Sequence, residues 1–201
     1  MDKYLEFIKQ VMAIAHTGIT YSKDPYALEN YHDLMELSKT MLHEYSSTNI
    51  PRIDLFADQR YPTPQPTVRI VIIQDEKMLF VKEKLGPSAG KWSLPGGWVD
   101  IGQSVLEAAI AEGEEESGYP LRIIRPLAIM DRSKYIESDI YDTFTLVFLA
   151  EVTGEYRGHN FEIEEIAWIN IGSMPDLSFK LTKKELSIIV NAYQSEEMYI
   201  E

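Results

Sequence analysis

The first 48 residues carry apolar side chains at the spacing of amphipathic helices. Apolar positions recur every three or four residues, at Tyr4, Phe7, Ile8, Val11, Met12 and Ile14, and then at Tyr31, Leu34, Met35, Leu37, Met41 and Leu42. Thr17-Gly18 is expected to end the first helix, and Asp24-Pro25 to begin the second as an N-cap followed by Pro. Because two helices cannot enclose a core, we expect them to pack on the rest of the chain or on another subunit.

From residue 67 onward the pattern changes to short apolar runs that are typical of strands. TVRIVII and MLFVKE flank the turn Asp75-Glu76-Lys77 and predict a hairpin. Further strands are expected over 121–130, 144–152 and 166–169. The strand over 144–152 is almost entirely apolar, which predicts burial on both of its faces.

Two helices are predicted among these strands by capping boxes, in which Ser or Thr is followed three residues later by Glu. One begins at Ser104 and stops at Gly118, and the other runs from Thr182 to about Tyr193. The face of the first helix that is expected to lie on the sheet consists of Leu106, Ala109, Ile110 and Gly113. Strands interleaved with two helices indicate an α/β fold, a mixed sheet sandwiched between helices.

A Pro-rich connector separates the two patterns. Residues 49–66, NIPRIDLFADQRYPTPQP, contain Pro62, Pro64 and Pro66, which favour extended chain and stop a helix. The predicted organisation is therefore a helical extension over 1–48, a connector over 49–66 and an α/β domain over 67–201.

Composition narrows the classes of function. The net charge of −13 over 201 residues argues against a general nucleic-acid or anionic-membrane surface, because both need basic patches. The chain has no Cys, which fits a reducing cytoplasm. The N-terminus MDKYLEFIKQV carries charges within its apolar stretch, and no run reaches about 18 apolar residues. We therefore expect a cytoplasmic protein without a signal peptide.

The first helix of the α/β domain ends in an acidic cluster, Glu112, Glu114, Glu115 and Glu116, where the helix dipole disfavours negative charge. Glu112 and Glu116 are four residues apart and share a face, so their charges repel. Such a run is either a solvated acidic face or a site for a hard divalent cation such as Mg²⁺. We favour the metal site, because an ion would relieve the repulsion and keep waters for a phosphate substrate.

The stretch LPGGWVDIGQSVLEAAIAEGEEESGY, from Leu94 to Tyr119, resembles the Nudix box. The residues on the positions that define the box are Gly97, Glu112, Glu115, Glu116, Gly118 and Tyr119. Three positions depart from the pattern: Gln103 replaces a Glu, Ala111 replaces the Arg that helps to orient the next Glu, and Gly113 replaces an apolar residue. The resemblance implies the α/β/α Nudix fold, and the departures put the rate in doubt more than the fold.

The resemblance extends over essentially the whole chain. A helical preface, a bridge containing Arg-Tyr-Pro and a hairpin leading to Trp-Ser-Leu-Pro-Gly-Gly-Trp resemble the N-terminally extended bacterial Nudix pyrophosphatases. Among these the CDP-choline pyrophosphatases are nearest, with ADP-ribose pyrophosphatases as neighbours. The implied reaction is attack of water on the diphosphate of a nucleoside diphosphate linked to a second moiety. We further expect a homodimer formed through residues 1–48, and no membrane partner.

The resemblance also implies a metal site and a base. Mg²⁺, with Mn²⁺ as a substitute, would be held by Glu112, Glu115, Glu116 and the backbone carbonyl of Gly96 or Gly97. The general base is expected outside the box, in HNFEIEE at 159–165, where Glu162 is preferred to Glu164 and Glu165. The alternative is that these three acids only flank a surface strand.

Substrate contacts are expected from Trp98, Tyr61, Arg69 and Arg132, because an aromatic ring can stack on a base and a guanidinium can reach phosphate. The alternatives are core packing, which we prefer for Trp92 and Trp168, and a solvated turn for Arg132 and Lys134. A second class of function stays open. Gln103 and Ala111 would also suit a Nudix-fold nucleotide-binding or regulatory module with weakened catalysis.

Overall fold

The computed structural model describes residues 3–45, 52–57, 61–100, 102–136 and 142–201. The chain forms two compact units. Unit 1 is Met1–Gln65 together with Ile136–Asp142, and unit 2 is Pro66–Tyr135 together with Thr143–Glu201. Residues 46–51 and 58–60 of the predicted connector lie outside the described residues. In the part of the chain that is described, no helix is long and apolar enough to cross a membrane.

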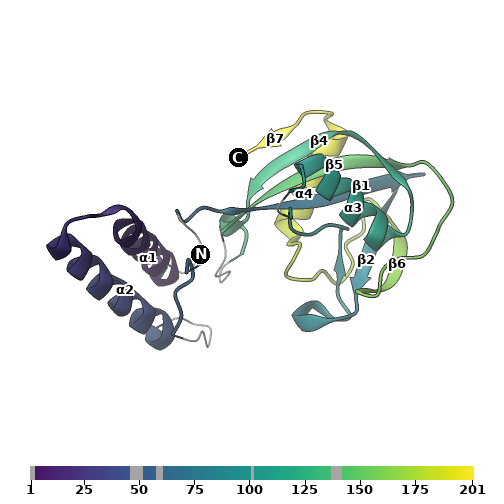
Figure 1. Ribbon diagram of the computed structural model, residues 1–201. Helices are drawn as coiled ribbons and strands as arrows, with labels where there is room; N and C mark the ends of the chain where they lie inside the picture. Colours follow the sequence, from purple (N-terminus) through teal and green to yellow (C-terminus); the bar gives the residue numbers. More distant parts are fainter. Residues whose placement is uncertain (1–2, 46–51, 58–60, 101, 137–141) are drawn as a thin grey trace. The chain divides into compact units, whose positions relative to one another are not determined.

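Unit 1 is built on two helices that lie side by side, α1 (Lys3–Tyr21) and α2 (Pro25–Tyr45) (Figure 1). Contrary to the expectation that two helices cannot enclose a core, they share one, which consists of Leu5, Ile8, Met12, Ala15, Met35 and Leu42. The carboxylate of Asp24 accepts a hydrogen bond from the amide of Ala27 at 3.2 Å, so Asp24 is the predicted N-cap of α2. Both predicted helices are thereby confirmed.

Gly18 does not end α1, contrary to the prediction, because the helix continues to Tyr21. A Cβ atom at Gly18 would lie 2.4 Å from the ring of Tyr31. Gly18 is therefore a close-packing residue that lets the Tyr31 ring of α2 lie against the backbone of α1.

A second set of apolar side chains on α1 faces solvent. We define the outer stripe as Tyr4, Phe7, Ile14 and Tyr21, which are 74%, 63%, 60% and 51% exposed. Their spacing of three and seven residues places them on one side of the helix. Since the core side chains Leu5, Ile8, Met12 and Ala15 occupy another side, α1 is apolar on two faces.

Unit 2 contains a mixed sheet and two helices. Its strands are β1 (Gln65–Gln74, beginning one residue before the unit), β2 (Lys77–Glu83), β3 (Trp92–Ser93), β4 (Leu121–Asp131), β5 (Thr143–Val152), β6 (Ile163–Asn170) and β7 (Tyr199–Ile200). The order in the sheet is β3-β2-β1-β5-β4-β7, with β6 also paired to β2. β4 is antiparallel to β5 and parallel to β7. The helices are α3 (Val105–Ser117) and α4 (Lys183–Gln194), with single 3₁₀ turns at Gly86–Ser88 and Arg132–Lys134.

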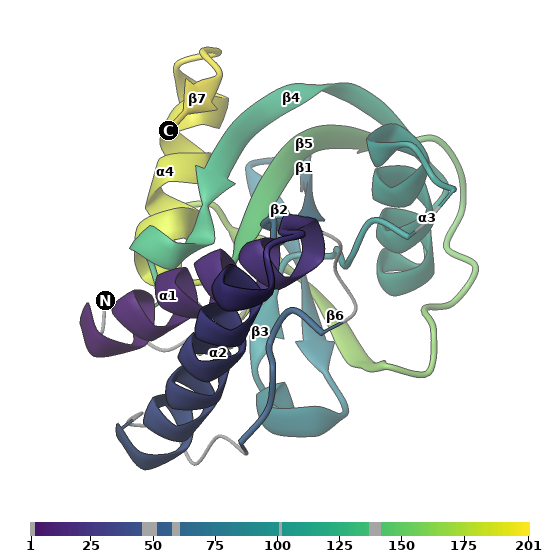
Figure 2. The same ribbon diagram turned by 60° about the vertical axis from the view of Figure 1, so that its left-hand side comes forward.

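The two helices cover opposite faces of the sheet (Figure 2). Alternation along β1 sends Val68, Ile70 and Ile72 into the core that includes Ala108 and Ala109 of α3. Val71 enters the other core, which includes Leu186 and Ile189 of α4. The predicted sandwich of a mixed sheet between helices is confirmed.

Two strand predictions need comment. The turn between β1 and β2 is the expected one, with positive φ at Asp75 (49°) and Glu76 (58°), as a two-residue hairpin turn requires. The prediction that 144–152 is buried on both faces is wrong at its start, because Phe144 is 44% exposed. A run of apolar residues does not show that both faces of a strand are covered. The short strands β3 and β7 were not expected.

The face of α3 that lies on the sheet also differs from the prediction. Leu106 and Ile110 are 52% and 36% exposed. Ala109 and Gly113 are buried as predicted, and Ala108, Glu116 and Ser117 are buried with them in place of Leu106 and Ile110. A Cβ atom at Gly113 would lie 2.8 Å from Leu121 Cδ1 and 3.2 Å from Ile70 Cγ1. Small residues thus let α3 approach the sheet closely, and this rotation turns the Glu116 carboxylate inward.

Candidate active site

The Pro95–Gly97 loop lies along β1 and ties the strand to the acidic helix. The amide of Val68 donates to the carbonyl of Gly97 at 2.9 Å, and the amide of Ile70 donates to the carbonyl of Pro95 at 2.8 Å. Gly96, between these two bonds, has φ +146°, and a Cβ atom there would lie 2.1 Å from the carbonyl oxygen of Val68. The loop can approach β1 this closely because Gly96 has no side chain.

Glu116 is the buried carboxylate of the site, with 4% exposure. Its Oε2 accepts a hydrogen bond from the amide of Gly96 at 2.8 Å. Burial raises the pKa of Glu116 to about 7, although the Gly96 amide and the nearby Arg69 act in the opposite direction. A carboxylate kept in this environment is costly for folding, which is typical of a functional group.

Glu112 lies one helical turn before Glu116 and contacts the second glycine of the loop. A Cβ atom at Gly97 would lie 2.5 Å from Glu112 Oε1, so any larger residue would displace the carboxylate. Burial raises the pKa of Glu112, with further contributions from the charges of Glu115, Glu162 and Asp100, while Arg69 lowers it. The box glutamates and Glu162 are therefore within electrostatic reach of one another.

The segment after β5 closes the C-terminal end of α3. α3 has the expected capping box at Ser104 and stops at Gly118, which has φ 74°. The amide of Arg157 donates to the carbonyl of Gly118 at 2.7 Å, and the amide of Asn160 donates to that of Glu115 at 2.7 Å. These bonds satisfy carbonyls that a helix end leaves free, and they carry the following residues towards the box.

The three acids of this segment have different surroundings. Glu164 and Glu165 lie 3.6 Å and 3.5 Å from the Lys82 ammonium. Glu162 is exposed, and its backbone amide donates a hydrogen bond to Asn160 Oδ1 at 3.1 Å. The charge of Glu162 acts on Glu112. Glu114, by contrast, accepts from the amide of Leu121 at 2.8 Å and therefore supports the start of β4.

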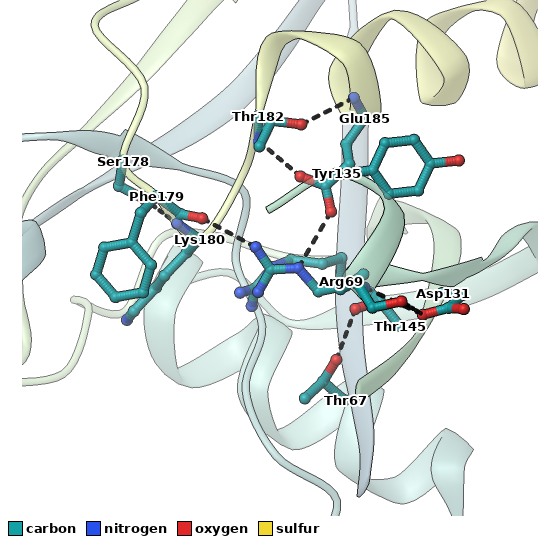
Figure 3. A network of polar contacts seen from close by, with 12 residues as sticks. Thr67, Arg69, Asp131, Tyr135, Thr145, Ser178, Phe179, Lys180, Thr182 and Glu185 are labelled. Atoms are coloured by element: carbon teal, nitrogen blue, oxygen red, sulfur yellow. Dashed lines mark hydrogen bonds and ion pairs between the residues drawn. The ribbon is translucent and has the colours of Figure 1, made fainter. Parts of the chain in front are cut away.

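Unit 2 also contains a network of polar contacts that includes several buried charged groups (Figure 3). The Arg132 guanidinium donates to Glu185 at 3.1 Å and to the carbonyl of Phe179 at 2.9 Å. Glu185 also forms the capping box of α4 with Thr182. Lys180 donates to the buried Glu83 at 2.8 Å. The predicted substrate residue Arg132 is thus 7% exposed and engaged inside unit 2 rather than on a solvated turn.

The other expected substrate residues lie in three different settings. Trp98 is 48% exposed and bridges to Thr67 of β1, directly after the glycine pair. Arg69 is 7% exposed, within the buried network. Tyr61 belongs to unit 1, where it is 59% exposed, lies 6.5 Å from the ring of Tyr21 and lines a cavity of about 520 Å³. Trp92 and Trp168 pack against the two cores, as preferred above.

The donor set fits a hard divalent cation in its chemistry. Glu112, Glu115 and Glu116 offer carboxylate oxygens, and the absence of a side chain at Gly97 brings the backbone next to the Glu112 carboxylate. Among the described residues, no group of three or more His, Cys, Asp or Glu is gathered closely enough to hold an ion without adjustment. The carbonyl of Gly97 already accepts from Val68, which leaves one lone pair for an ion.

Sequence reasoning missed two contributors to the site. The charge of Asp100 raises the pKa of Glu112 from within the box loop. Asp100 stands at a position that the box pattern does not specify, so the sequence did not single it out. Glu83 acts on both Glu116 and Arg69 from the end of β2. A lone Glu at the end of a strand is ordinary in sequence, so only the fold could identify it.

Comparisons with known proteins agree over both units. The NUDIX domain model matches residues 63–189, and the model of a UDP-X-like, N-terminal oligomerisation domain matches residues 2–56. The chain is 35% identical to “Putative ADP-ribose pyrophosphatase YjhB” of Bacillus subtilis, over 93% of this chain and 90% of that protein. It is 29% identical to an ADP-ribose pyrophosphatase of Methanocaldococcus jannaschii, over 67% of this chain and 79% of that protein.

Solved structures show the same similarity. A UDP-X diphosphatase structure aligns with a TM-score of 0.64 and 29% identity, covering 98% of each chain. An ADP-ribose pyrophosphatase from Streptococcus suis aligns with a TM-score of 0.60 and 30% identity, covering 69% of this chain and all of that one. The similarity to the first of these includes the N-terminal unit.

Proposed function

The chain belongs to the Nudix hydrolase family, and from that premise we propose that it hydrolyses the diphosphate linkage of a nucleoside diphosphate joined to a second moiety. The products would be a nucleoside monophosphate and the other phosphorylated half. The observation that carries this proposal is the buried Glu116 and the partly buried Glu112 against the Gly96-Gly97 loop, in a chain whose relatives are named as pyrophosphatases.

ADP-ribose is the first substrate to test. The sequence resemblance placed CDP-choline ahead of ADP-ribose, whereas the relatives reported above are named for ADP-ribose or UDP-X compounds. All three belong to one chemical class, a nucleotide joined through a diphosphate to a small group. The order in which these substrates are tested rests on the names of the relatives and not on contacts seen in the site.

Mg²⁺, or Mn²⁺ in its place, is the proposed cofactor, held by Glu112, Glu115 and Glu116 with the carbonyl of Gly97. When bound, such an ion would neutralise phosphate charge and lower the pKa of a coordinated water. The Gly96 amide fixes one oxygen of Glu116, so the protein itself orients this carboxylate. Gly97 has no side chain and therefore leaves room for the carboxylate of Glu112.

The remaining residues divide the work of the hydrolysis. Water attacks one phosphorus, the bridging P–O bond breaks, and a carboxylate oxygen of Glu162 accepts the proton of the water. The exposed position of Glu162 and its coupling to Glu112 support this role. Trp98, half exposed beside the glycine pair, is the proposed stacking surface for the base.

The test is a panel containing ADP-ribose, a UDP-sugar, CDP-choline and nucleoside triphosphates, each with Mg²⁺ and with EDTA. We expect the highest kcat/KM for a diphosphate-linked compound, release of the nucleoside monophosphate, and no turnover with EDTA. A clear preference for triphosphates would contradict the substrate class. Binding of ADP-ribose without turnover of any compound would favour the nucleotide-binding module instead.

We further propose that the protein is a homodimer in which the outer stripe of α1 contacts a second copy. Four large apolar side chains on one helix face are more than a solvated helix needs. The match of residues 2–56 to an oligomerisation domain supports self-association through unit 1. Light scattering should give twice the chain mass, and an active monomer at micromolar concentration would refute the proposal.

A further inference from the structure

The acidic helix α3 contains no positive charge of its own. Between Val105 and Ser117 it carries Glu107, Glu112, Glu114, Glu115 and Glu116, and no Lys or Arg. Glu116 is buried and Glu112 is partly buried, so water compensates their charge poorly. Positive charge for these two carboxylates must therefore come from another element of unit 2.

Two of the nearby cations are already committed to other acids. Arg132 is paired with Glu185 at 3.1 Å, and Lys180 is paired with Glu83 at 2.8 Å. Both acids are buried, so these pairs are local and strongly held. Arg69 is left as the cation whose charge acts on both Glu112 and Glu116.

Arg69 is buried without a direct carboxylate partner among the described residues. Its Nη1 makes one hydrogen bond there, a long one of 3.4 Å to the carbonyl of Val68. Burial, followed by the charge of Arg132, lowers the pKa of Arg69 below its ordinary value. A guanidinium with five donors is rarely left in this state unless its charge has another use.

The geometry directs that charge towards the box. An ideal Cβ on Gly96 would lie 2.9 Å from Arg69 Nη1, so the guanidinium packs against Gly96. The amide of the same glycine donates to Glu116 Oε2 at 2.8 Å. Arg69 and Glu116 therefore meet at one residue, with the small Gly96 between them.

We propose that Arg69 is a positioning residue, whose buried guanidinium balances the charge of Glu112 and Glu116 and so keeps both carboxylates in place for a divalent cation. When Glu112 and Glu116 are both ionised, these carboxylates and one guanidinium leave a charge of −1, and the exposed Glu115 makes it −2, which matches a divalent ion. This proposal rests on one part of the proposed function, that the box glutamates bind a divalent cation, and it does not depend on which substrate is hydrolysed. It differs from direct phosphate binding, which a side chain with 7% exposure is poorly placed to perform.

The first experiment measures Mn²⁺ binding by calorimetry without substrate, in wild type, Arg69→Met and Arg69→Lys. Arg69→Met should weaken binding by about ten-fold, the size of one lost charge interaction in a partly screened site, and Arg69→Lys should recover most of it. Turnover should show a lower kcat at saturating metal with a small change in the substrate KM. Unchanged Mn²⁺ binding with a raised KM would make Arg69 a phosphate ligand and overturn the proposal. Tighter binding would also overturn it, because Arg69 would then only repel the ion.

Arg132→Met is the matched control. It removes another buried guanidinium of the same network, whose partner is Glu185 rather than the box. It should lower the melting temperature and leave the Mn²⁺ affinity of the folded protein within about two-fold. An equal loss of Mn²⁺ affinity in both variants would mean that the network acts only through general stability, which contradicts a specific role for Arg69.

A stability cycle tests the same inference without metal or turnover. Arg69→Met is measured by chemical denaturation in wild type and in Glu116→Gln, both with EDTA. If Arg69 balances Glu116, its loss should destabilise the Glu116→Gln protein less than the wild type. Additive effects would refute the coupling.

If the Arg69→Met variant does not fold on its own, recovery of folding when Glu116→Gln is added supports the proposal. If it folds in neither background, Arg69→Lys takes its place in the cycle. Mn²⁺ calorimetry and the stability cycle are both measured without substrate, so their outcomes do not depend on which compound is hydrolysed.

Discussion

Helices α1 and α3 place their side chains in opposite ways. α1 of unit 1 leaves Phe7 and Ile14 more than half exposed, while its other apolar face forms the core with α2. α3 of unit 2 leaves Leu106 exposed and buries the charged Glu116. Both arrangements cost folding free energy when the unit is considered alone.

The difference identifies what each helix is for. An exposed apolar stripe can be covered by another protein surface, which suits an oligomerisation unit. A buried carboxylate cannot be relieved in this way, and in α3 it accepts a hydrogen bond from the Gly96 amide and lies within reach of the Arg69 charge. The exposed apolar side chains of α1 therefore indicate a protein partner, and the buried Glu116 of α3 indicates a cationic ligand, because each would offset the unfavourable folding free energy of the group that it contacts. The following changes test this comparison.

The largest effect is expected from Glu116→Gln, which keeps the size of the side chain and removes one charged ligand. The rate should fall by at least ~10²-fold, or about 2.7 kcal/mol of transition-state stabilisation. Steady-state kinetics with a metal titration provides the measurement. Gln103→Ala is the control and should change the rate by less than about three-fold, because Gln is a poor Mg²⁺ ligand. If Glu116→Gln leaves the rate and its metal dependence unaltered, the box is not the catalytic site.

Ile14→Asp should weaken the proposed dimer by about 10- to 100-fold, since burying one such side chain is worth about 1.5–3 kcal/mol. Sedimentation equilibrium over a concentration series measures the change. Ile124→Asp is matched to it, because Ile124 is 53% exposed but lies on β4 of unit 2. Equal dimer stability in Ile14→Asp and wild type would show that the outer stripe is not the interface.

The metal-free protein should lose stability as pH rises from about 4.5 to about 7. In this window the native state keeps a proton on Glu116, whose pKa is raised to about 7, while the unfolded state has lost it. Stability is therefore highest below the unfolded pKa, and the loss is complete above the folded pKa, at up to about 3 kcal/mol. Denaturation in EDTA, compared with Glu116→Gln, isolates this component. A difference between the two proteins that does not vary with pH would contradict it.

The smallest effect is expected from Gly113→Ala. Helix propensity alone predicts a gain of about 0.5–1 kcal/mol. The contact with Leu121 should outweigh it and give a net loss of about 1–2 kcal/mol, because the core there has no room for a methyl group. Gly172→Ala is the control, since a Cβ atom there meets nothing within 4 Å. A more stable Gly113→Ala protein would show that α3 can move away from the sheet.

The parts that were predicted from the sequence are those with local signals. The capping boxes at Ser104 and Thr182, the stop at Gly118 and the β1–β2 turn each depend on residues within a few positions of one another. Strand periodicity and the interleaved helices were enough for the α/β sandwich. The box resemblance placed the glutamates on one helix, and the structure describes them there.

What the sequence could not supply depends on contacts between distant residues. Helix periodicity placed Gly113 and Ala109 on the buried face of α3, but it also placed Leu106 and Ile110 there, because it does not register how closely Gly113 approaches Leu121 and Ile70. Gly18 looked like a helix stop, because its packing against Tyr31 of another helix has no local signal. Arg69 was predicted to contact the substrate, and its burial beside Gly96 follows only from the loop that lies on β1.

The bonds from Arg157 and Asn160 to the end of α3 have a consequence for the order in which the protein is made. The box is synthesised well before the segment that closes it, and β4 and β5 lie between them in the sequence. During translation, α3 therefore emerges from the ribosome with its acidic end open and without Glu162. We expect the nascent chain to acquire the complete site late, after β5 has been released and paired, so that arrest peptides placed before residue 157 should yield chains that do not hydrolyse the substrate.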